Sequence, residues 1–344
     1  MLWFALFLLA VTSSATATDD DSSCSLLEIP TVTLHNGVAM PILQLGTAQL
    51  IETPQPGSNF VGMLPERGFR QLDQALSVGV RAFDSAYIYR SQPVLGHVLG
   101  EWFRDGRLTR QEVFVVSKVH HPYAEPCFGI SHMPDWDDMT HEEIGVRTRQ
   151  HFEESLKELH FGYVDLMLLH WPGSEGGTVE SNRQKRLAAW KVLETMYQKG
   201  FARAIGVSNF SSVHLEQLKE DGAEIVPMVN QFEASIFLQY PQILEYCQKH
   251  NIVPQAYSPL RGRSEFPSVV HELARKYDKD VGQITFRYLL QLGYAIVYMT
   301  NTESRMISNT QVFDFELSAT EMQQLKALAR SDTSWGLPSP HDLL

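Results

Sequence analysis

The 344-residue chain is poor in cysteine, basic residues and long apolar runs, and each shortage argues against a class of protein. Its three cysteines, Cys24, Cys127 and Cys247, have no CxxC spacing, so we expect a fold that does not depend on a disulfide framework. The chain has 28 Lys and Arg against 40 Asp and Glu, a net charge of −12, and no strong basic cluster. We therefore expect no nucleic-acid partner.

An unbroken apolar run covers residues 2–11 and is too short for a membrane-spanning helix, which needs about 20 residues. Residues 15–17, Ala-Thr-Ala, fit a small-x-small cleavage pattern. These features predict a secretory signal peptide over residues 1–17, a leader over residues 18–27 and no stable membrane span. The prediction for location is the secretory pathway or the extracellular space. Because the first residues hold no Lys or Arg, an organellar or cytoplasmic location stays open as the alternative.

From residue 28 onwards, eight short apolar runs alternate with amphipathic helical stretches. This alternation predicts parallel βαβ units within a single domain over residues 28–344. The apolar runs are 43–46, 82–84, 113–119, 164–169, 204–207, 228–231, 253–256 and 295–298. The helical stretches include 69–76, 143–159, 187–197, 215–219 and 243–250.

Two features favour a closed (β/α)8 barrel, the TIM barrel, over an open doubly wound sheet. No GxGxxG motif opens a helix after an early strand, so the dinucleotide fingerprint of open sheets is missing. Polar residues suited to chemistry end successive runs, and such ends meet at one mouth of a barrel, where we also expect extended loops. Before the first run, Asn36-Gly37 predicts the turn of an N-terminal β-hairpin over residues 31–43, which would close the barrel bottom.

Four residues near the ends of these runs are candidates for catalysis. Lys118 ends a hydrophobic run, where an ammonium costs energy unless it is paired or its pKa falls. Asp84 and His170 also end apolar runs, but each alone fits a helix cap or a satisfied core histidine about as well. Tyr89 alone fits ordinary packing.

The sequence around these four residues resembles the aldo-keto reductase family. The resemblance covers about residues 28–330, and its motifs occur in one order along the chain. They read FDSAxxY (83–89), SK (117–118), YVDL and LHWP (163–172), AIGVSNF (204–210), VNQ (229–231), AYSPL (256–260) and VFDF (312–315). The resemblance implies a barrel enzyme that reduces an aldehyde or ketone with NADPH.

In that family a tyrosine is the general acid, and the resemblance gives this role to Tyr89. Carbonyl reduction leaves an alkoxide that must be protonated or stabilised as it forms. A phenol is a weak acid near neutral pH, so a nearby Lys118 ammonium would make it a better proton donor. Asp84 would hold that ammonium by a charge-assisted hydrogen bond, and His170 would orient the carbonyl oxygen.

The resemblance also assigns cofactor-binding residues, one by one. Tyr257 would stack on the nicotinamide ring, and three residues would bind its carboxamide, namely Ser208, Asn209 and Gln231. Two would line the pyrophosphate path, Ser258 and Leu260. Three would contact the adenosine end, Thr300, Arg305 and Asn309, with the forked donors of Arg305 suited to a 2′-phosphate.

The chain departs from the family pattern at two places. The family usually carries Pro-Lys at the end of the eighth strand, whereas this chain has Tyr298-Met299, so one cation for the 2′-phosphate is missing. Because Arg305 remains, we predict NADPH, with NADH or dual use as an alternative. After Tyr89, Ser91-Gln92 replaces the usual Asn-Glu.

Residues 119–140 make a longer loop than the family usually has. It places His120 at the expected pocket wall, and Trp136 and Trp335 are further candidates for that wall, although ordinary packing explains both tryptophans equally well. No HxxxH or CxxC spacing occurs in this loop, so we predict no metal site. Asn209-Phe210-Ser211 is a formal glycosylation sequon, which we predict to be buried and unglycosylated.

The expected partner is a small-molecule carbonyl substrate of a monomer or weak oligomer. One alternative is a non-catalytic cofactor-binding barrel that acts as a redox-sensing or interaction subunit. The complete set of Asp84, Tyr89, Lys118 and His170 argues against it, because a pure binding module needs no such acid. Another is a barrel enzyme of unrelated chemistry, against which the set of nicotinamide-contacting residues argues.

Overall fold

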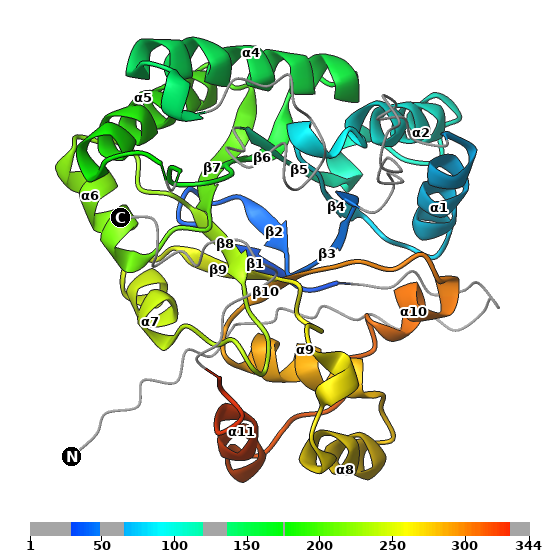
Figure 1. The fold of residues 1–344 in the computed structure, drawn as a ribbon. Coiled ribbons are helices and arrows are strands. Elements are labelled where there is room, and N and C mark those ends of the chain that lie inside the picture. Colours follow the sequence, from blue (N-terminus) through cyan, green and yellow to red (C-terminus); the bar gives the residue numbers. More distant parts are fainter. Residues whose placement is uncertain (1–28, 49–64, 120–135, 175, 331–344) are drawn as a thin grey trace, which may run out of the picture.

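The structure is a computed structural model that describes residues 29–48, 65–119, 136–174 and 176–330 (Figure 1). Eight parallel strands close into a barrel in the order β10-β3-β4-β5-β6-β7-β8-β9, and helices surround them (Figure 1). The predicted (β/α)8 barrel is confirmed. The strands are β3 (Leu43–Gly46), β4 (Ala82–Asp84), β5 (Phe114–Val119), β6 (Val164–Leu169), β7 (Ala202–Ser208), β8 (Val229–Glu233), β9 (Val253–Tyr257) and β10 (Ala295–Tyr298).

The five helical stretches expected from the sequence each correspond to a helix, and all five helices begin at least two residues earlier than expected. In α4, for example, Thr140 caps the helix by accepting from the Glu143 N–H, so the helix begins two residues before the apolar periodicity does. The helices are α1 (Pro65–Ser77), α2 (Gln92–Arg104), α4 (His141–Leu159), α5 (Val179–Gln198), α6 (Ser212–Glu220), α7 (Pro241–Lys249), α8 (Ser268–Tyr277), α9 (Val281–Gln291), α10 (Glu303–Ser308) and α11 (Ala319–Lys326).

The predicted hairpin forms from β1 (Thr31–Thr33) and β2 (Ala39–Pro41). Gly37 has φ +89°, a conformation that glycine adopts without steric cost, and this allows the turn. Asn36 donates to the carbonyl of Arg203, which lies near the amino end of β7 (2.9 Å). Leu34 and Met40 are buried in the core. The hairpin therefore closes the amino-terminal end of the barrel and leaves the carboxyl end open.

One buried carboxylate ties three strands together near the closed end. Asp165 in β6 accepts a hydrogen bond from the Val115 N–H in β5 (2.8 Å). Its two oxygens also pair with Arg110 (2.8 Å) and with Arg203 in β7 (2.7 Å). Since the Asp165 side chain is fully buried, all of its hydrogen bonding comes from the protein rather than from water.

Of the three cysteines, Cys247 alone lies within the described residues, where it is a free, buried thiol. Burial raises its pKa to about 12, which a hydrogen bond from Asn230 counteracts in part. Among the described helices, none is long and apolar enough to cross a membrane. The predicted signal peptide, the leader, Cys24 and Cys127 lie outside the described residues, and the predictions for these segments and for the domain limits stay predictions.

We expect Asp165→Ala to lower the free energy of unfolding by about 3 kcal/mol, because it leaves the buried end of Arg110 and a strand N–H without their acceptor. Urea unfolding followed by circular dichroism measures this. Asp105→Ala is the matched control, since Asp105 also pairs with arginines but its side chain is 48% exposed. Its effect should stay within about 0.5 kcal/mol, and equal losses in the two variants would contradict the assignment.

Candidate active site

The polar residues that end the strands meet at the open, carboxyl-terminal mouth of the barrel. Asp84 is the last residue of β4, Lys118 lies near the end of β5, and His170 follows β6. Tyr89 ends a short 3-10 helix, η2 (Tyr87–Tyr89). A cavity of about 180 Å³ opens at this mouth. The described residues that line it are Gly46, Ala48, Asp84, Tyr89, His170, Trp171, Asn209, Gln231, Tyr257, Ser258, Pro259, Val297 and Met299.

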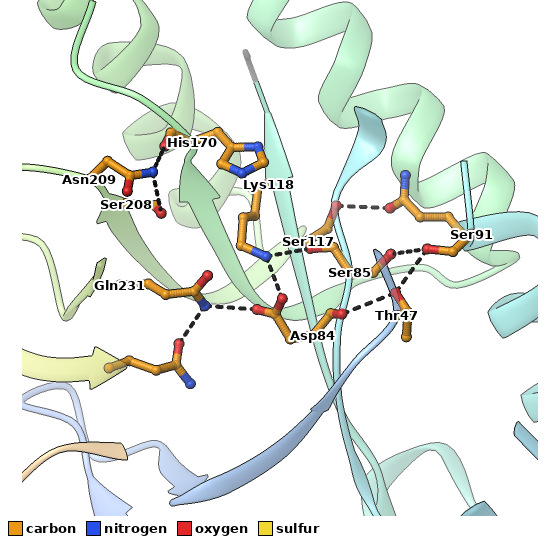
Figure 2. Close-up of polar contacts among 12 residues, drawn as sticks. Thr47, Asp84, Ser85, Ser91, Ser117, Lys118, His170, Ser208, Asn209 and Gln231 are labelled. Atoms are coloured by element: carbon orange, nitrogen blue, oxygen red, sulfur yellow. Dashed lines mark hydrogen bonds and ion pairs between the residues drawn. The ribbon is translucent and has the colours of Figure 1, made fainter. Parts of the chain in front are cut away.

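A buried ion pair lies beneath this cavity (Figure 2). The Lys118 Nζ donates to Asp84 Oδ1 (2.5 Å) and to the Ser85 carbonyl (3.0 Å). Lys118 is only 1% exposed and Asp84 only 3%. Burial lowers the pKa of the Lys118 ammonium, and the Asp84 carboxylate counteracts part of this lowering. The sequence analysis expected such a lysine to be paired or to have a lowered pKa, and Lys118 has both an acidic partner and a lowered pKa.

Tyr89 and His170 face each other beside this ion pair. Their ring centres lie 5.7 Å apart with the planes at 77°. Lys118 Nζ lies 4.9 Å from the centre of the Tyr89 ring. Tyr89 is partly exposed, whereas Lys118 is covered, so the phenol borders the cavity and the ammonium supports it from below. The structure thus brings all four predicted catalytic residues together.

Gln231 connects the ion pair to the far wall of the barrel (Figure 2). Its Nε2 donates one hydrogen to Asp84 Oδ2 (2.8 Å) and the other to Gln255 Oε1 in β9 (2.8 Å). Both amide hydrogens are therefore used within the protein. The Oε1 of Gln231 has no hydrogen-bond partner among the described residues, so it is available as an acceptor at the cavity wall.

Asn209 joins the histidine strand to the tyrosine at the end of β9. Its Nδ2 donates to the His170 carbonyl (3.0 Å) and to Ser208 Oγ (3.1 Å), and its Oδ1 accepts from the Tyr257 hydroxyl (2.8 Å). Asn209 and Ser258 both have positive φ, +63° and +52°, which turns the chain sharply after each strand. Asn209 is buried, as the sequence predicts for this sequon.

The other predicted cofactor residues lie away from the lining of this cavity. Leu260 is in the segment after β9, and Thr300 follows β10, where its carbonyl accepts from Gln71 (2.9 Å). Arg305 is in α10 and Asn309 caps the end of that helix. Met299, at the place of the family's lysine, lines the cavity and is 43% exposed.

The structure gives Ser91 and Gln92 clear partners. The hydroxyl of Ser91 lies within hydrogen-bond distance of the hydroxyls of Thr47 (2.8 Å) and Ser85 (3.1 Å). Gln92 accepts from Ser117 Oγ (2.8 Å) and donates to Glu158 on α4 (3.1 Å). A glutamate at position 92 would face the Glu158 carboxylate, whereas the Gln92 amide donates to it, so the departure from the family pattern fits its neighbour on α4.

The structure places Trp136 away from the cavity, contrary to its prediction as a pocket wall. Trp136 is 1% exposed, belongs to the hydrophobic core and is not among the described residues that line the cavity. The Lys185 ammonium donates to the Trp136 carbonyl (2.8 Å) and fixes this segment from α5. His120 and Trp335 lie outside the described residues.

Two residues with contacts at this site were not predicted from the sequence. Gln255 supports Gln231, and Arg186 donates to the carbonyl of Pro172, two residues after His170. The sequence offered one weak signal for each residue. Gln255 is a polar residue within the apolar run 253–256, and Arg186 is a charged residue directly before the helical stretch 187–197. Among the described residues, no group of three or more His, Cys, Asp or Glu side chains could hold a metal ion.

Comparisons with known proteins agree with one another. A sequence model described as the aldo/keto reductase family matches residues 43–330. Glyoxal reductase of Bacillus subtilis is 34% identical over 316 residues, which cover 91% of this chain and 97% of that protein. NADPH-dependent codeinone reductase 1-2 of Papaver somniferum is 32% identical over 324 residues, which cover 89% of this chain and 91% of that protein.

The fold matches solved structures in the same way. The crystal structure of a Bombyx mori aldo-keto reductase in complex with NADP superposes with a TM-score of 0.71 at 26% identity. The match covers 88% of this chain and 93% of that protein. The (β/α)8 barrel of this chain therefore matches the fold of a solved aldo-keto reductase whose structure holds NADP.

We expect the Lys118 ammonium to titrate below the ordinary range of a lysine, because burial disfavours its charge. Asp84→Asn should lower this pKa further, since it removes the carboxylate that raises it. Carbon NMR of lysine labelled at Cε measures both, with the Lys118→Met spectrum to assign the resonance. A titration in the ordinary lysine range, or an upward shift in Asp84→Asn, would contradict this reading of the ion pair.

Proposed function

The chain belongs to the aldo-keto reductase family, and we propose that it reduces an aldehyde or ketone to an alcohol with Tyr89 as the general acid. As a member of that family it is an oxidoreductase that uses NADP(H). The observation that carries the proposal is a single cavity that Tyr89 and His170 line together with Asn209, Gln231 and Tyr257. Both parts of a reductase site thus border the same space.

Tyr89 supplies the proton in this proposal. The carbonyl oxygen gains negative charge as the carbon is reduced, and a phenol at the cavity wall can donate to it. The positive charge of Lys118, 4.9 Å from the ring centre, stabilises the phenolate that remains. Asp84 holds Lys118 in place through the 2.5 Å ion pair. The proton returns to Tyr89 from solvent through the open mouth of the barrel.

His170 orients the substrate. Its ring stands nearly perpendicular to that of Tyr89, so a carbonyl oxygen placed between them can accept from both side chains. The His170 backbone is fixed on two sides, because its N–H donates to the Val119 carbonyl (2.9 Å) and its carbonyl accepts from Asn209 (3.0 Å).

Gln231, Tyr257 and Ser258, which also line this cavity, fit a nicotinamide cofactor, whose bound form supplies the hydride. Gln231 offers an acceptor to an amide group, since both of its own hydrogens are used by Asp84 and Gln255. Tyr257 places an aromatic ring at the cavity, with its hydroxyl fixed on Asn209. Ser258, with its left-handed backbone, begins the turn that we propose for the pyrophosphate. The cofactor is therefore held by groups that are already ordered by one another.

The NADPH-dependent codeinone reductase relative supports NADPH as the cofactor. In this proposal Arg305 on α10 contacts the 2′-phosphate, while Met299 contributes no charge where the family usually has a lysine. Two chemically different carbonyl reductases, for glyoxal and for codeinone, stand among the relatives, so they support the reaction class and leave the substrate to be found.

Tyr89→Phe should reduce kcat roughly 100- to 10,000-fold, the range of a lost general acid. The dissociation constant of NADPH should stay nearly unchanged, because the hydroxyl has no part in cofactor binding. Turnover of NADPH with nitrobenzaldehyde or glyoxal measures the first, and quenching of tryptophan fluorescence the second. Tyr87→Phe is the matched control, since the Tyr87 hydroxyl binds Glu154 (2.5 Å) and does not line the cavity.

An active Tyr89→Phe enzyme would refute the assignment of the acid. Tight NADPH binding without turnover by the wild-type protein, across a broad panel of aldehydes and ketones, would instead favour a non-catalytic cofactor-binding barrel.

Met299→Lys should lower the dissociation constant of NADPH roughly 10-fold, the effect of one added charge-assisted hydrogen bond to phosphate. NADH binding should not change, because NADH lacks the 2′-phosphate. Fluorescence titration with each cofactor measures this, and Met299→Leu is the control for side-chain shape. An equal gain for both cofactors would place position 299 away from the 2′-phosphate.

A further inference from the structure

The segment that follows His170 is held by side chains rather than by a strand. β6 ends at Leu169, and three side chains then bind the backbone that follows. Asn209 donates to the His170 carbonyl (3.0 Å), and Arg186 Nε donates to the Pro172 carbonyl (2.8 Å). The Asn182 side chain accepts from the Ser174 N–H (3.3 Å) and donates to the Ser174 carbonyl (2.9 Å). The position of the His170 ring therefore depends on these side chains as well as on the bond from its N–H to the Val119 carbonyl in β5.

Arg186 contacts residues next to both His170 and Asn209, namely Pro172 and Phe210. It lies in α5, is fully buried, and reaches across to α6, where its Nη1 donates to Gln217 (2.9 Å). Its guanidinium carbon lies 5.8 Å from the centre of the Phe210 ring. Phe210 is the residue after Asn209, and Pro172 is two residues after His170. One guanidinium thus packs between the two segments whose side chains face the cavity.

The burial of Arg186 is energetically costly. Among the described residues, none of the ion pairs includes Arg186, so its charge lacks a carboxylate within contact distance. Burial lowers its pKa to about 10, an effect that the more distant Asp221 counteracts and Arg183 adds to. For buried ion pairs, replacement by apolar residues of similar volume is often neutral for stability or stabilising. Its hydrogen bonds to Pro172 and Gln217 offset part of this cost, and the same two bonds hold the segment after His170 against α6.

We propose that Arg186 is a positioning residue, which holds the Pro172 carbonyl and the Phe210 ring so that His170 and Asn209 keep a fixed separation. This rests on the proposed role of His170 in orienting the carbonyl. A displacement of about 1 Å at a reacting group can cost roughly 100-fold in rate. A flexible neutral side chain at this position would not fix the segments of His170 and Asn209. The planar guanidinium of Arg186 instead donates to the Pro172 carbonyl and to Gln217 in fixed directions.

Arg186→Met is the first test, with Arg183→Met as the matched control. Arg183 lies three residues earlier on the same helix and also binds the end of α6, but through Glu220 and Asp221 and, among the described residues, without a bond to the His170 segment. Arg186→Met should lower kcat/KM for nitrobenzaldehyde roughly 10- to 100-fold and raise the dissociation constant of NADPH several-fold through Asn209. Arg183→Met should change neither quantity. Wild-type values of both quantities in folded Arg186→Met overturn the proposal.

A double-mutant cycle with His170→Ala separates positioning from general damage to the fold. If Arg186 acts through His170, the loss of kcat/KM caused by Arg186→Met should nearly vanish in the His170→Ala background. An undiminished loss overturns the proposal. If His170→Ala itself has no effect, the proposed role of His170 fails, and the NADPH dissociation constant, which needs no turnover, then decides whether Arg186 positions Asn209.

Arg186→Lys covers the case in which the methionine variant does not fold. Lysine keeps the charge but is a point donor without the planar fork, so it cannot serve the Pro172 carbonyl and Gln217 in the same geometry. A folded Arg186→Lys protein should show a partial loss of kcat/KM, and Gln217→Leu, which removes the α6 contact, should shift it in the same direction. Wild-type kinetics and NADPH affinity in both variants overturn the proposal.

Discussion

The open mouth of the barrel depends on one interaction, the buried ion pair between Asp84 and Lys118. Each partner alone would be a buried charge that the core could not tolerate, and together they are placed by two neighbouring parallel strands. The pair also needs acceptors and donors for its remaining atoms. The Ser85 carbonyl serves Lys118 and the Gln231 amide serves Asp84, so the polar network around the pair extends to three strands and the turn after β4.

Much of the fold was predictable because a barrel repeats one simple pattern. The apolar runs 43–46, 82–84, 164–169 and 295–298 coincide with β3, β4, β6 and β10, and the other four strands differ by one or two residues at their ends. Helix α9 shows why some helices were not singled out. Its start is marked by a capping box of Asp280 and Gln283, a signal separate from the apolar periodicity on which the predicted stretches rest. At α4 the cap, not the periodicity, set the first residue.

The residues of the candidate site also fall into two groups, those that the sequence could predict and those that it could not. Residues at strand ends, such as Asp84 and His170, could be predicted because the topology brings all strand ends to one mouth. Partners across the barrel could not, because no local pattern shows that Gln255 supports Gln231 or that Arg186 lies behind Pro172. Trp136 was expected at the pocket wall from its place in a long loop, but loop position does not determine burial, and its side chain packs into the core.

Gln231 has one further consequence, which concerns thermodynamic linkage. The same amide group touches the Asp84 carboxylate and borders the space proposed for the nicotinamide. A ligand that donates a hydrogen bond to the Gln231 oxygen would polarise the amide and strengthen the hydrogen bond from Gln231 to Asp84. This would in turn change the strength of the ion pair between Asp84 and the Lys118 ammonium. Such coupling is reciprocal, so the protonation state of the lysine must change the affinity for the ligand by the same factor. A ligand on the Gln231 oxygen and the proton on Lys118 would therefore be linked through Asp84.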